Sequence, residues 1–375
     1  MNMRVYIVIS LFSVLLSSCG GGSKKETVTE KTKRTPETEA LLVSLKQMPG
    51  YGIMFGQHDA PVYGIGWQGD ENRSDVKSVC GDYPAVMSFD LGHIELGKEN
   101  NLDNVSFDRI RREIIAQYNR GGVITISWHV DNPATGGNSW DVSDSTTVAS
   151  LLFDGMNHVK LLRWLDCVAN FMNSLQTEEG VKVPVIFRPW HEHTGSWFWW
   201  GEQLCTTADY KALWRLTYDY LCEKGVDNLL YAYSPGVEPG SVDEYLARYP
   251  GDDIVDLVGF DCYVYNENDY LRQMTTMLKI VTEVATQHNK AMAVTETGYE
   301  TIPDSVWWTQ TLLPLLTDYP VSYVLVWRNA YNRDNHYYAP YPGHMSEADF
   351  VTFYENPRTL FLTDVQSINI YTENK

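Results

Sequence analysis

One pattern recurs along the chain and is clearest at Val185-Ile186-Phe187-Arg188-Pro189-Trp190-His191-Glu192-His193, where an apolar run of strand length meets charged and aromatic residues. Seven more apolar or β-branched runs predict strands at 53–56, 85–89, 123–127, 229–233, 255–260, 292–295 and 323–326. Segments with helical periodicity lie between or after them, at 107–118, 209–223, 268–288, 303–316 and 347–354. Continuous apolar strands alternating with amphipathic helices predict a parallel sheet covered by helices.

Eight such strands in one chain favour the closed form of this α/β architecture, a (β/α)8 TIM barrel in a single catalytic domain. The alternative is an open doubly wound sheet, but Gly56-Gln57-His58-Asp59 follows the first strand in place of a glycine-rich phosphate-binding turn. Polar or aromatic residues follow every predicted strand: Gln57, His58 and Asp59; Asp90 and His93; Trp128, His129, Asp131 and Asn132; Arg188, Trp190, His191 and Glu192; Tyr233; Asp261 and Tyr263; Glu296; Trp327, Arg328 and Asn329. Because the carboxyl ends of barrel strands meet at one face, these residues are expected to share a cleft.

Two of these residues, Glu192 and Glu296, have the chemistry of a glycosidase pair. They follow the fourth and seventh strands, which lie on facing sides of an eight-stranded ring. Glycoside hydrolysis needs one protonated and one ionised carboxyl group, and retaining enzymes hold them about 5 to 5.5 Å apart. We expect neighbouring aromatic rings to raise the pKa of Glu192, and Arg328 and Tyr263 to keep Glu296 ionised.

The aromatic residues around Glu192 predict a sugar subsite. Four tryptophans fall within eleven residues, at 190, 197, 199 and 200, and the C–H face of a pyranose ring stacks on indole. The alternative is an aromatic-rich corner of the core in which Glu192 is only salt-bridged. Metal binding by His191, Glu192 and His193 is disfavoured, since adjacent residues at a strand end diverge and the helical two-histidine spacing of zinc proteases is absent. No metal and no cofactor are expected.

Longer motifs give a resemblance to a known family. The segment Trp190-His191-Glu192-His193-Thr194-Gly195-Ser196-Trp197-Phe198-Trp199-Trp200-Gly201 resembles glycoside hydrolase family 26. Shorter motifs occur in the order of that family: Ser127–Pro133, Gly259–Tyr263, Thr295–Gly298 and Trp327–Asn329. The similarity runs from about Leu41 to Asp364. It implies a (β/α)8 barrel that acts by double displacement, with mannan endo-1,4-β-mannosidase activity (EC 3.2.1.78) on mannan, galactomannan or glucomannan.

The resemblance also implies roles for individual residues. Glu192 would be the acid/base and Glu296 the nucleophile, with His191 and Tyr263 orienting the two carboxyl groups. The substrate-binding residues would be His129, His191, Trp197, Asp261, Tyr263, Trp327 and Arg328. Two alternatives stay open: an exo-acting enzyme that releases mannobiose, if the long segments Leu91–Asn104 and Ala134–Asn157 block the cleft, and a non-catalytic glycan-binding lipoprotein, which the presence of both carboxyl groups disfavours.

The first residues predict export. Arg4 precedes an apolar segment, Val5–Leu16, that is too short to span a bilayer and is typical of a secretory signal. It ends at Leu16-Ser17-Ser18-Cys19-Gly20, which resembles a bacterial lipoprotein signal with Cys19 as the lipidated residue; an ordinary signal peptide is the alternative. The predicted division is a signal peptide at 1–18, a flexible tether at 19–39 and the catalytic domain at 40–375.

Charge and cysteine content restrict partners and location. A net charge of −19 argues against binding to nucleic acid or to an anionic membrane surface and is compatible with a neutral mannan polysaccharide or oligosaccharide. We expect a monomer, anchored in the cell envelope by lipid on Cys19. The absence of an acidic run directly after Cys19 favours the periplasmic face over the cell surface. The other cysteines, Cys80, Cys167, Cys205, Cys222 and Cys262, have scattered spacings typical of free thiols.

Overall fold

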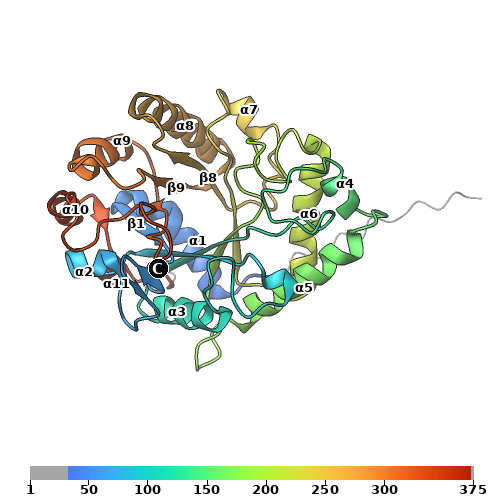
Figure 1. The fold of residues 1–375 in the computed structure, drawn as a ribbon, viewed down its shortest axis with the longest axis horizontal. Coiled ribbons are helices and arrows are strands. Elements are labelled where there is room, and N and C mark those ends of the chain that lie inside the picture. The colour runs from blue at the N-terminus through green and yellow to red at the C-terminus, as the bar shows by residue number, and fades with distance from the viewer. Residues whose placement is uncertain (1–32, 373–375) are drawn as a thin grey trace, which may run out of the picture. The chain divides into compact units, whose positions relative to one another are not determined.

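The computed structural model describes residues 33–372, and its centre is a closed barrel of eight parallel strands (Figure 1). The barrel strands are β1 (Ile53–His58), β4 (Val86–Asp90), β5 (Val123–Ser127), β6 (Val185–Arg188), β7 (Leu229–Tyr233), β8 (Leu257–Tyr263), β9 (Ala291–Gly298) and β10 (Tyr323–Val326). Each strand pairs with the next in sequence, and β10 pairs with β1 to close the ring. The predicted (β/α)8 barrel is confirmed, and each of the eight predicted runs overlaps one barrel strand.

Helices surround the barrel (Figure 1). They are α1 (Pro36–Gln47), α2 (Asp75–Cys80), α3 (Phe107–Asn119), α4 (Thr147–Leu151), α5 (His158–Ser174), α6 (Thr207–Glu223), α7 (Val242–Leu246), α8 (Glu267–His288), α9 (Leu313–Leu316), α10 (Glu347–Tyr354) and α11 (Leu362–Ile368), with the short helices η1 (Met48–Gly50), η2 (Ile94–Leu96) and η3 (Trp308–Leu312). Three short strands, β2 (Tyr63–Gly64), β3 (Trp67–Gln68) and β11 (Thr359–Leu360), complete the described elements. No helix within residues 33–372 combines the length and the apolar character needed to cross a bilayer.

Helix α1 corrects one predicted boundary. It begins at Pro36, four residues before the predicted start of the domain at residue 40, because Thr35 caps its first turn by accepting a hydrogen bond from the backbone N–H of Thr38. Arg34, which also lies in the predicted tether, forms an ion pair with Asp256. The earlier part of that tether, the signal peptide and Cys19 lie outside the described residues.

Two apolar layers hold the barrel together. Inside it, Met54, Val86, Ile186 and other inward side chains pack in one cluster with Leu41 and Leu45 of α1. The backbone N–H of Thr35 bonds to Asp227 O, just before β7, so α1 covers the amino ends of the strands. The carboxyl ends at the opposite face are left for the site.

A second, larger cluster lies between the strands and the outer helices. Helix α5, which the sequence analysis did not predict, buries Leu161, Leu165, Val168 and Met172 in it at helical spacing. Cys262 belongs to this cluster, and it carries a free thiol, as do Cys80, Cys167 and Cys205.

Candidate active site

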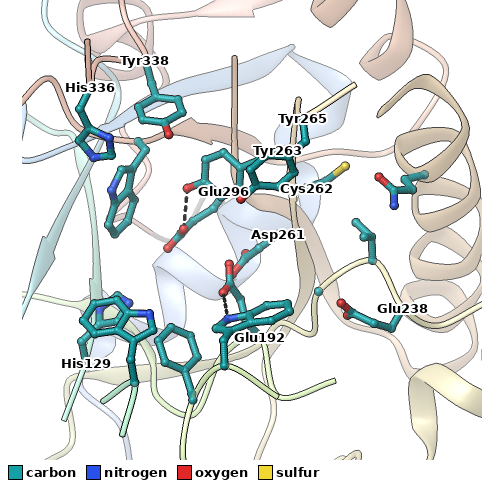
Figure 2. A pocket seen from close by; sticks show the side chains of 17 residues that line it. His129, Glu192, Glu238, Asp261, Cys262, Tyr263, Tyr265, Glu296, His336 and Tyr338 are labelled. Atoms are coloured by element: carbon teal, nitrogen blue, oxygen red, sulfur yellow. Dashed lines mark hydrogen bonds between the residues drawn. The ribbon is translucent and has the colours of Figure 1, made fainter. Parts of the chain in front are cut away.

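A cavity of about 480 Å³ opens at the carboxyl ends of the barrel strands (Figure 2). Its walls are built from the loops that follow β5, β6, β7, β8 and β10, from the ends of β8 and β9, and from helix α8. The lining residues are His129, Trp140, Glu192, Trp197, Phe198, Gly236, Val237, Glu238, Asp261, Cys262, Tyr263, Tyr265, Gln273, Glu296, Trp327, His336 and Tyr338.

Glu192 and Glu296 meet at the centre of this cavity. Glu192 follows β6 and Glu296 lies within β9, and a carboxylate oxygen of each lies within 4.8 Å of the other. An oxygen of Asp261, from β8, lies within the same distance of both. Figure 2 shows the three carboxyl groups together in the middle of the pocket. The separation of the two glutamates is close to the spacing used by retaining glycosidases.

The backbone after β6 turns sharply to place Glu192 in the cavity. Both Trp190 (φ 54°) and Glu192 (φ 51°) have left-handed conformations, which are uncommon for residues other than glycine. Buried bonds fix the turn. The N–H of Glu192 donates to Ser234 O at 2.8 Å, and the indole N–H of Trp200 donates to His191 O at 2.8 Å. Strained backbone that is held in this way is common at functional sites.

The environment of Glu192 favours its protonated form. Burial raises the pKa of this carboxyl group to about 7, and the nearby charge of Glu296 acts in the same direction. The indole N–H of Trp197 donates a hydrogen bond of 2.7 Å to Glu192 Oε2, which opposes the increase. At neutral pH Glu192 therefore stands near its midpoint, where one group can both give and take a proton.

The environment of Glu296 instead stabilises a carboxylate. The guanidinium of Arg188, at the end of β6, donates through Nη2 to Glu296 Oε1 and through Nη1 to Asp261 Oδ2 at 2.7 Å. The hydroxyl of Tyr263 donates to Glu296 Oε2 at 2.7 Å. All four side chains are buried or nearly so, and the two oxygens of Glu296 each receive a hydrogen bond. Glu192 and Glu296 thus lie in contrasting environments: burial favours a proton on Glu192, whereas Glu296 accepts hydrogen bonds at both of its oxygens.

His129 forms one wall beside the carboxyl pair. Its Nδ1 lies 2.7 Å from Asp90 Oδ2, and the net effect of Asp90 is to raise the pKa of the imidazole although burial acts against this. Its Nε2 lies 3.2 Å from Nε2 of His191. Asp90 is fixed in turn by the hydroxyl of Ser127 and the N–H of Gly92. The ring of His129 is therefore held in one orientation toward the cavity.

Comparison with known proteins identifies the family. Residues 30–345 match the model described as glycosyl hydrolase family 26. The chain belongs to this family.

Several family 26 structures and sequences are similar to the chain. A beta-mannanase from Bacteroides ovatus is 60% identical with a TM-score of 0.90, over 91% of this chain and 99% of that chain. A protein from Muricauda sp. is 32% identical with a TM-score of 0.82, over 90% of this chain and 94% of that chain. The mannan endo-1,4-beta-mannosidase of Bifidobacterium adolescentis is 33% identical over 87% of this chain, which spans only 34% of that relative. The Bacillus subtilis enzyme of the same name is 28% identical over 68% of this chain and 69% of its own length.

The family 26 site brings together most of the residues predicted from sequence. Those that line the cavity are Glu192, Glu296, His129, Trp197, Asp261, Tyr263 and Trp327. Trp327 stacks on His58, with 4.1 Å between the ring centroids, so its position is fixed from behind. Asp261 reaches the cavity, but its oxygens already accept hydrogen bonds from Arg188 and Thr295. Asp261 therefore acts mainly by holding Arg188 in position.

The predicted pairing of Arg328 with Glu296 is wrong. Arg328 forms an ion pair with Asp103 at 2.9 Å and a hydrogen bond with the hydroxyl of Tyr63 at 3.2 Å. Arg188 takes its place at Glu296. The predicted role of His191 also differs, because its imidazole bonds to His129 and not to Glu192. Neither Arg328 nor His191 lines the cavity.

The tryptophan cluster divides between core and surface. Trp190, Trp199 and Trp200 are fully buried, and their indole N–H groups donate to Thr217 Oγ1, Val130 O and His191 O. Only Trp197, at 41% exposure, opens to the cavity. Three of the four indoles therefore support the turn that carries Glu192, and the aromatic lining from this segment reduces to Trp197 and Phe198.

Other aromatic and polar residues take part in the lining and were not predicted: Trp140, Glu238, Tyr265, Gln273, His336 and Tyr338. Gln273 lies in α8 and the others lie in loops without a strand-end pattern, so periodicity gave no signal for their place in the site. Asn329 fixes the backbone of one of them, Tyr338. Its side-chain oxygen accepts from the N–H groups of Tyr338 and Ala339, which folds the loop after β10 back over the site.

Proposed function

We propose that this family 26 chain hydrolyses β-1,4-mannosidic linkages of mannan, galactomannan or glucomannan with retention of configuration. The observation that carries the proposal is the close approach of Glu192 and Glu296, whose carboxylate oxygens lie within 4.8 Å in contrasting environments. The assignment of mannan as the substrate is supported by the similar proteins, several of which are named mannan endo-1,4-beta-mannosidase.

In the first step Glu296 is the nucleophile. Its ionised carboxylate, held by Arg188 and Tyr263, attacks the anomeric carbon of a mannosyl residue. Glu192 gives its proton to the glycosidic oxygen as the carbon–oxygen bond breaks, so the departing sugar leaves as a neutral alcohol. The product is a covalent mannosyl ester on Glu296 with inverted configuration.

In the second step Glu192, now a carboxylate, acts as the base. It takes a proton from a water molecule as the water oxygen attacks the anomeric carbon, and the carboxylate of Glu296 departs. This second inversion restores the β configuration. Arg188 and Tyr263 are placed to stabilise the carboxylate of Glu296 at both ends of the cycle.

Two variants test the assigned roles. Glu296→Ala is expected to abolish release of sugar from mannotetraose and of dinitrophenolate from 2,4-dinitrophenyl β-mannobioside, since both need the nucleophile. Glu192→Ala is expected to lose far more activity on mannotetraose than on the dinitrophenyl substrate, whose leaving group needs no proton. Glu283→Ala, on the exposed face of α8, is the control. Equal losses for Glu192→Ala on both substrates would contradict the acid/base assignment.

End-directed action that releases mannobiose is a second candidate, favoured by one observation. The long segment Leu91–Asn104 is tied to the cleft edge by the ion pair between Asp103 and Arg328, the residue next to the lining Trp327. Products from linear mannan distinguish the two modes: an early ladder of sizes indicates internal cutting, and mannobiose alone from the start indicates end-directed action.

We also propose that the chain is a lipoprotein anchored through Cys19 on the periplasmic face of the cell envelope. The support is in the sequence: Arg4, the apolar segment 5–16, the Leu16-Ser17-Ser18-Cys19 motif and the absence of acidic residues just after Cys19. Incorporation of labelled palmitate that is lost in Cys19→Ala tests the anchor. Digestion by protease added to intact cells would contradict the periplasmic placement.

A further inference from the structure

The cavity extends to both sides of Glu192 and Glu296, and the residues that line the two sides differ in character. Figure 2 shows His129, His336 and Tyr338 on one side of Glu192 and Glu296, and Glu238, Cys262 and Tyr265 on the other. The first side contains aromatic rings that are braced by other side chains, such as Trp327 on His58. The second side contains two exposed polar side chains, Glu238 and Tyr265.

Tyr265 is the most prominent of these groups, because it lines the cavity and yet is 95% exposed. Its backbone is nevertheless fixed on both sides. The N–H of Val264 donates to Gly298 O at 2.9 Å, and the side chain of Asn266 caps α8 by accepting from the N–H of Asp269. The ring is thus carried by a rigid loop and presents a face that no described residue covers.

Two polar side chains line the same cavity as Tyr265. Gln273, in the second turn of α8, lines the cavity, and its amide forms no hydrogen bond within residues 33–372. Glu238 accepts a hydrogen bond of 2.6 Å from the hydroxyl of Thr194 at Oε2. The other oxygen, Glu238 Oε1, forms no hydrogen bond within residues 33–372. An aromatic face with a carboxylate and an amide beside it matches a neutral sugar, which offers a C–H face and hydroxyl groups.

We propose that Tyr265, Gln273 and Glu238 form a binding site for the sugar unit on the leaving-group side of the cleaved linkage. This inference rests on the proposed function. The orientation follows from Glu192, since the general acid must stand beside the departing oxygen. Thr194, two residues after Glu192, is bonded to Glu238, so the segment that supplies the acid also forms this side of the cleft.

A comparison of two substrates tests the site. Mannotetraose places sugar on the leaving-group side, whereas 2,4-dinitrophenyl β-mannobioside has no sugar there. The ratio of kcat/KM for mannotetraose to that for the dinitrophenyl substrate is expected to fall roughly threefold to tenfold in Tyr265→Ala and in Gln273→Ala, the size of one lost contact or hydrogen bond. Tyr51→Ala is the matched control, an exposed tyrosine near the amino end of β1, at the face opposite the cavity.

The outcomes separate this inference from the proposed function. If the native chain releases neither sugar nor dinitrophenolate, the proposed function fails. If it cleaves both substrates and the ratio in Tyr265→Ala, Gln273→Ala and Glu238→Gln stays within twofold of the native value, the leaving-group site is overturned. A fall in the ratio that also occurs in Tyr51→Ala would overturn it too.

Discussion

Removing the guanidinium of Arg188 is the sharpest perturbation of the site. Arg188 is 2% exposed, and its two nitrogens bond to Asp261 and Glu296, which are each 4% exposed. Replacement by Met keeps most of the side-chain volume and leaves two carboxylates in a dry environment without a cation. Burial of an unpaired charge is far more costly than loss of the attraction itself.

The expected loss of unfolding free energy in Arg188→Met follows from the burial of the ion pairs. Breaking a buried ion pair by removal of one partner costs about 3 to 5 kcal/mol of unfolding free energy. An exposed pair of the same length gives the comparison: Arg73 bonds to Asp70 at 2.7 Å, with side chains 43% and 49% exposed. Arg73→Met is expected to cost about 0 to 1 kcal/mol. The Arg188–Asp261 distance is also 2.7 Å, so the two arginines differ in burial and in the second carboxylate that Arg188 bonds, and not in the length of this pair.

Urea denaturation of the two variants beside the native chain measures this difference. The loss in Arg188→Met is expected to be smaller at pH 5 than at pH 8, because protonation of Asp261 or Glu296 removes the unpaired charge. A loss for Arg188→Met no larger than that for Arg73→Met, at equal denaturant slopes, would refute the reasoning. Activity adds a second measure: kcat is expected to fall by about 100-fold or more, as when a preorganised charge partner is removed.

Three other changes have defined outcomes. Trp197→Phe removes the hydrogen bond that stabilises the carboxylate of Glu192, so the alkaline limb of the kcat/KM profile should move upward by about 0.4 to 1 pH unit; a downward shift would contradict this. Glu296→Gln removes the neighbouring charge, so the pKa of Glu192, followed by 13C NMR, should fall by about 0.6 to 2 units. Burial raises the pKa of Glu95 to about 7, so the folded state binds the extra proton and unfolding free energy should decrease by up to about 3 kcal/mol as pH rises from 4.5 to 7. Glu95→Gln should flatten that decrease in urea titrations at each pH.

The barrel could be predicted because its signals are local and repeated. Each strand is a short apolar run that is buried on both faces, and each is followed by polar residues at the open end. Helix α5 was missed even though its apolar residues follow a helical period, since the long segment Ala134–Asn157 separates it from β5. The start of α1 was predicted too late in the chain, because it depends on a single capping residue, Thr35, within a polar stretch.

Side-chain partners in the site were less predictable than its carboxyl groups. Arg188 and Arg328 each follow a strand end, and sequence alone gives no reason to prefer one as the partner of Glu296. The choice depends on where Asp103 lies, because its carboxylate takes Arg328 away from the centre. Asp103 is in a loop with no periodic pattern. A loop residue thus decides which strand-end arginine serves the site, and such a contact is visible only in three dimensions.

The contrast between the two glutamates follows from how charge is shared around them. Arg188 serves Asp261 and Glu296 together, so one cation faces two anions, and Glu192 has no cation of its own among the bonded partners of residues 33–372. Burial raises the pKa of Glu192, and the neighbouring charge of Glu296 raises it further. Once Glu296 is converted to a neutral ester, that opposing charge disappears and Glu192 becomes the stronger acid. The same arrangement that keeps the proton on Glu192 for the first step therefore favours its release before the second, when a base is needed.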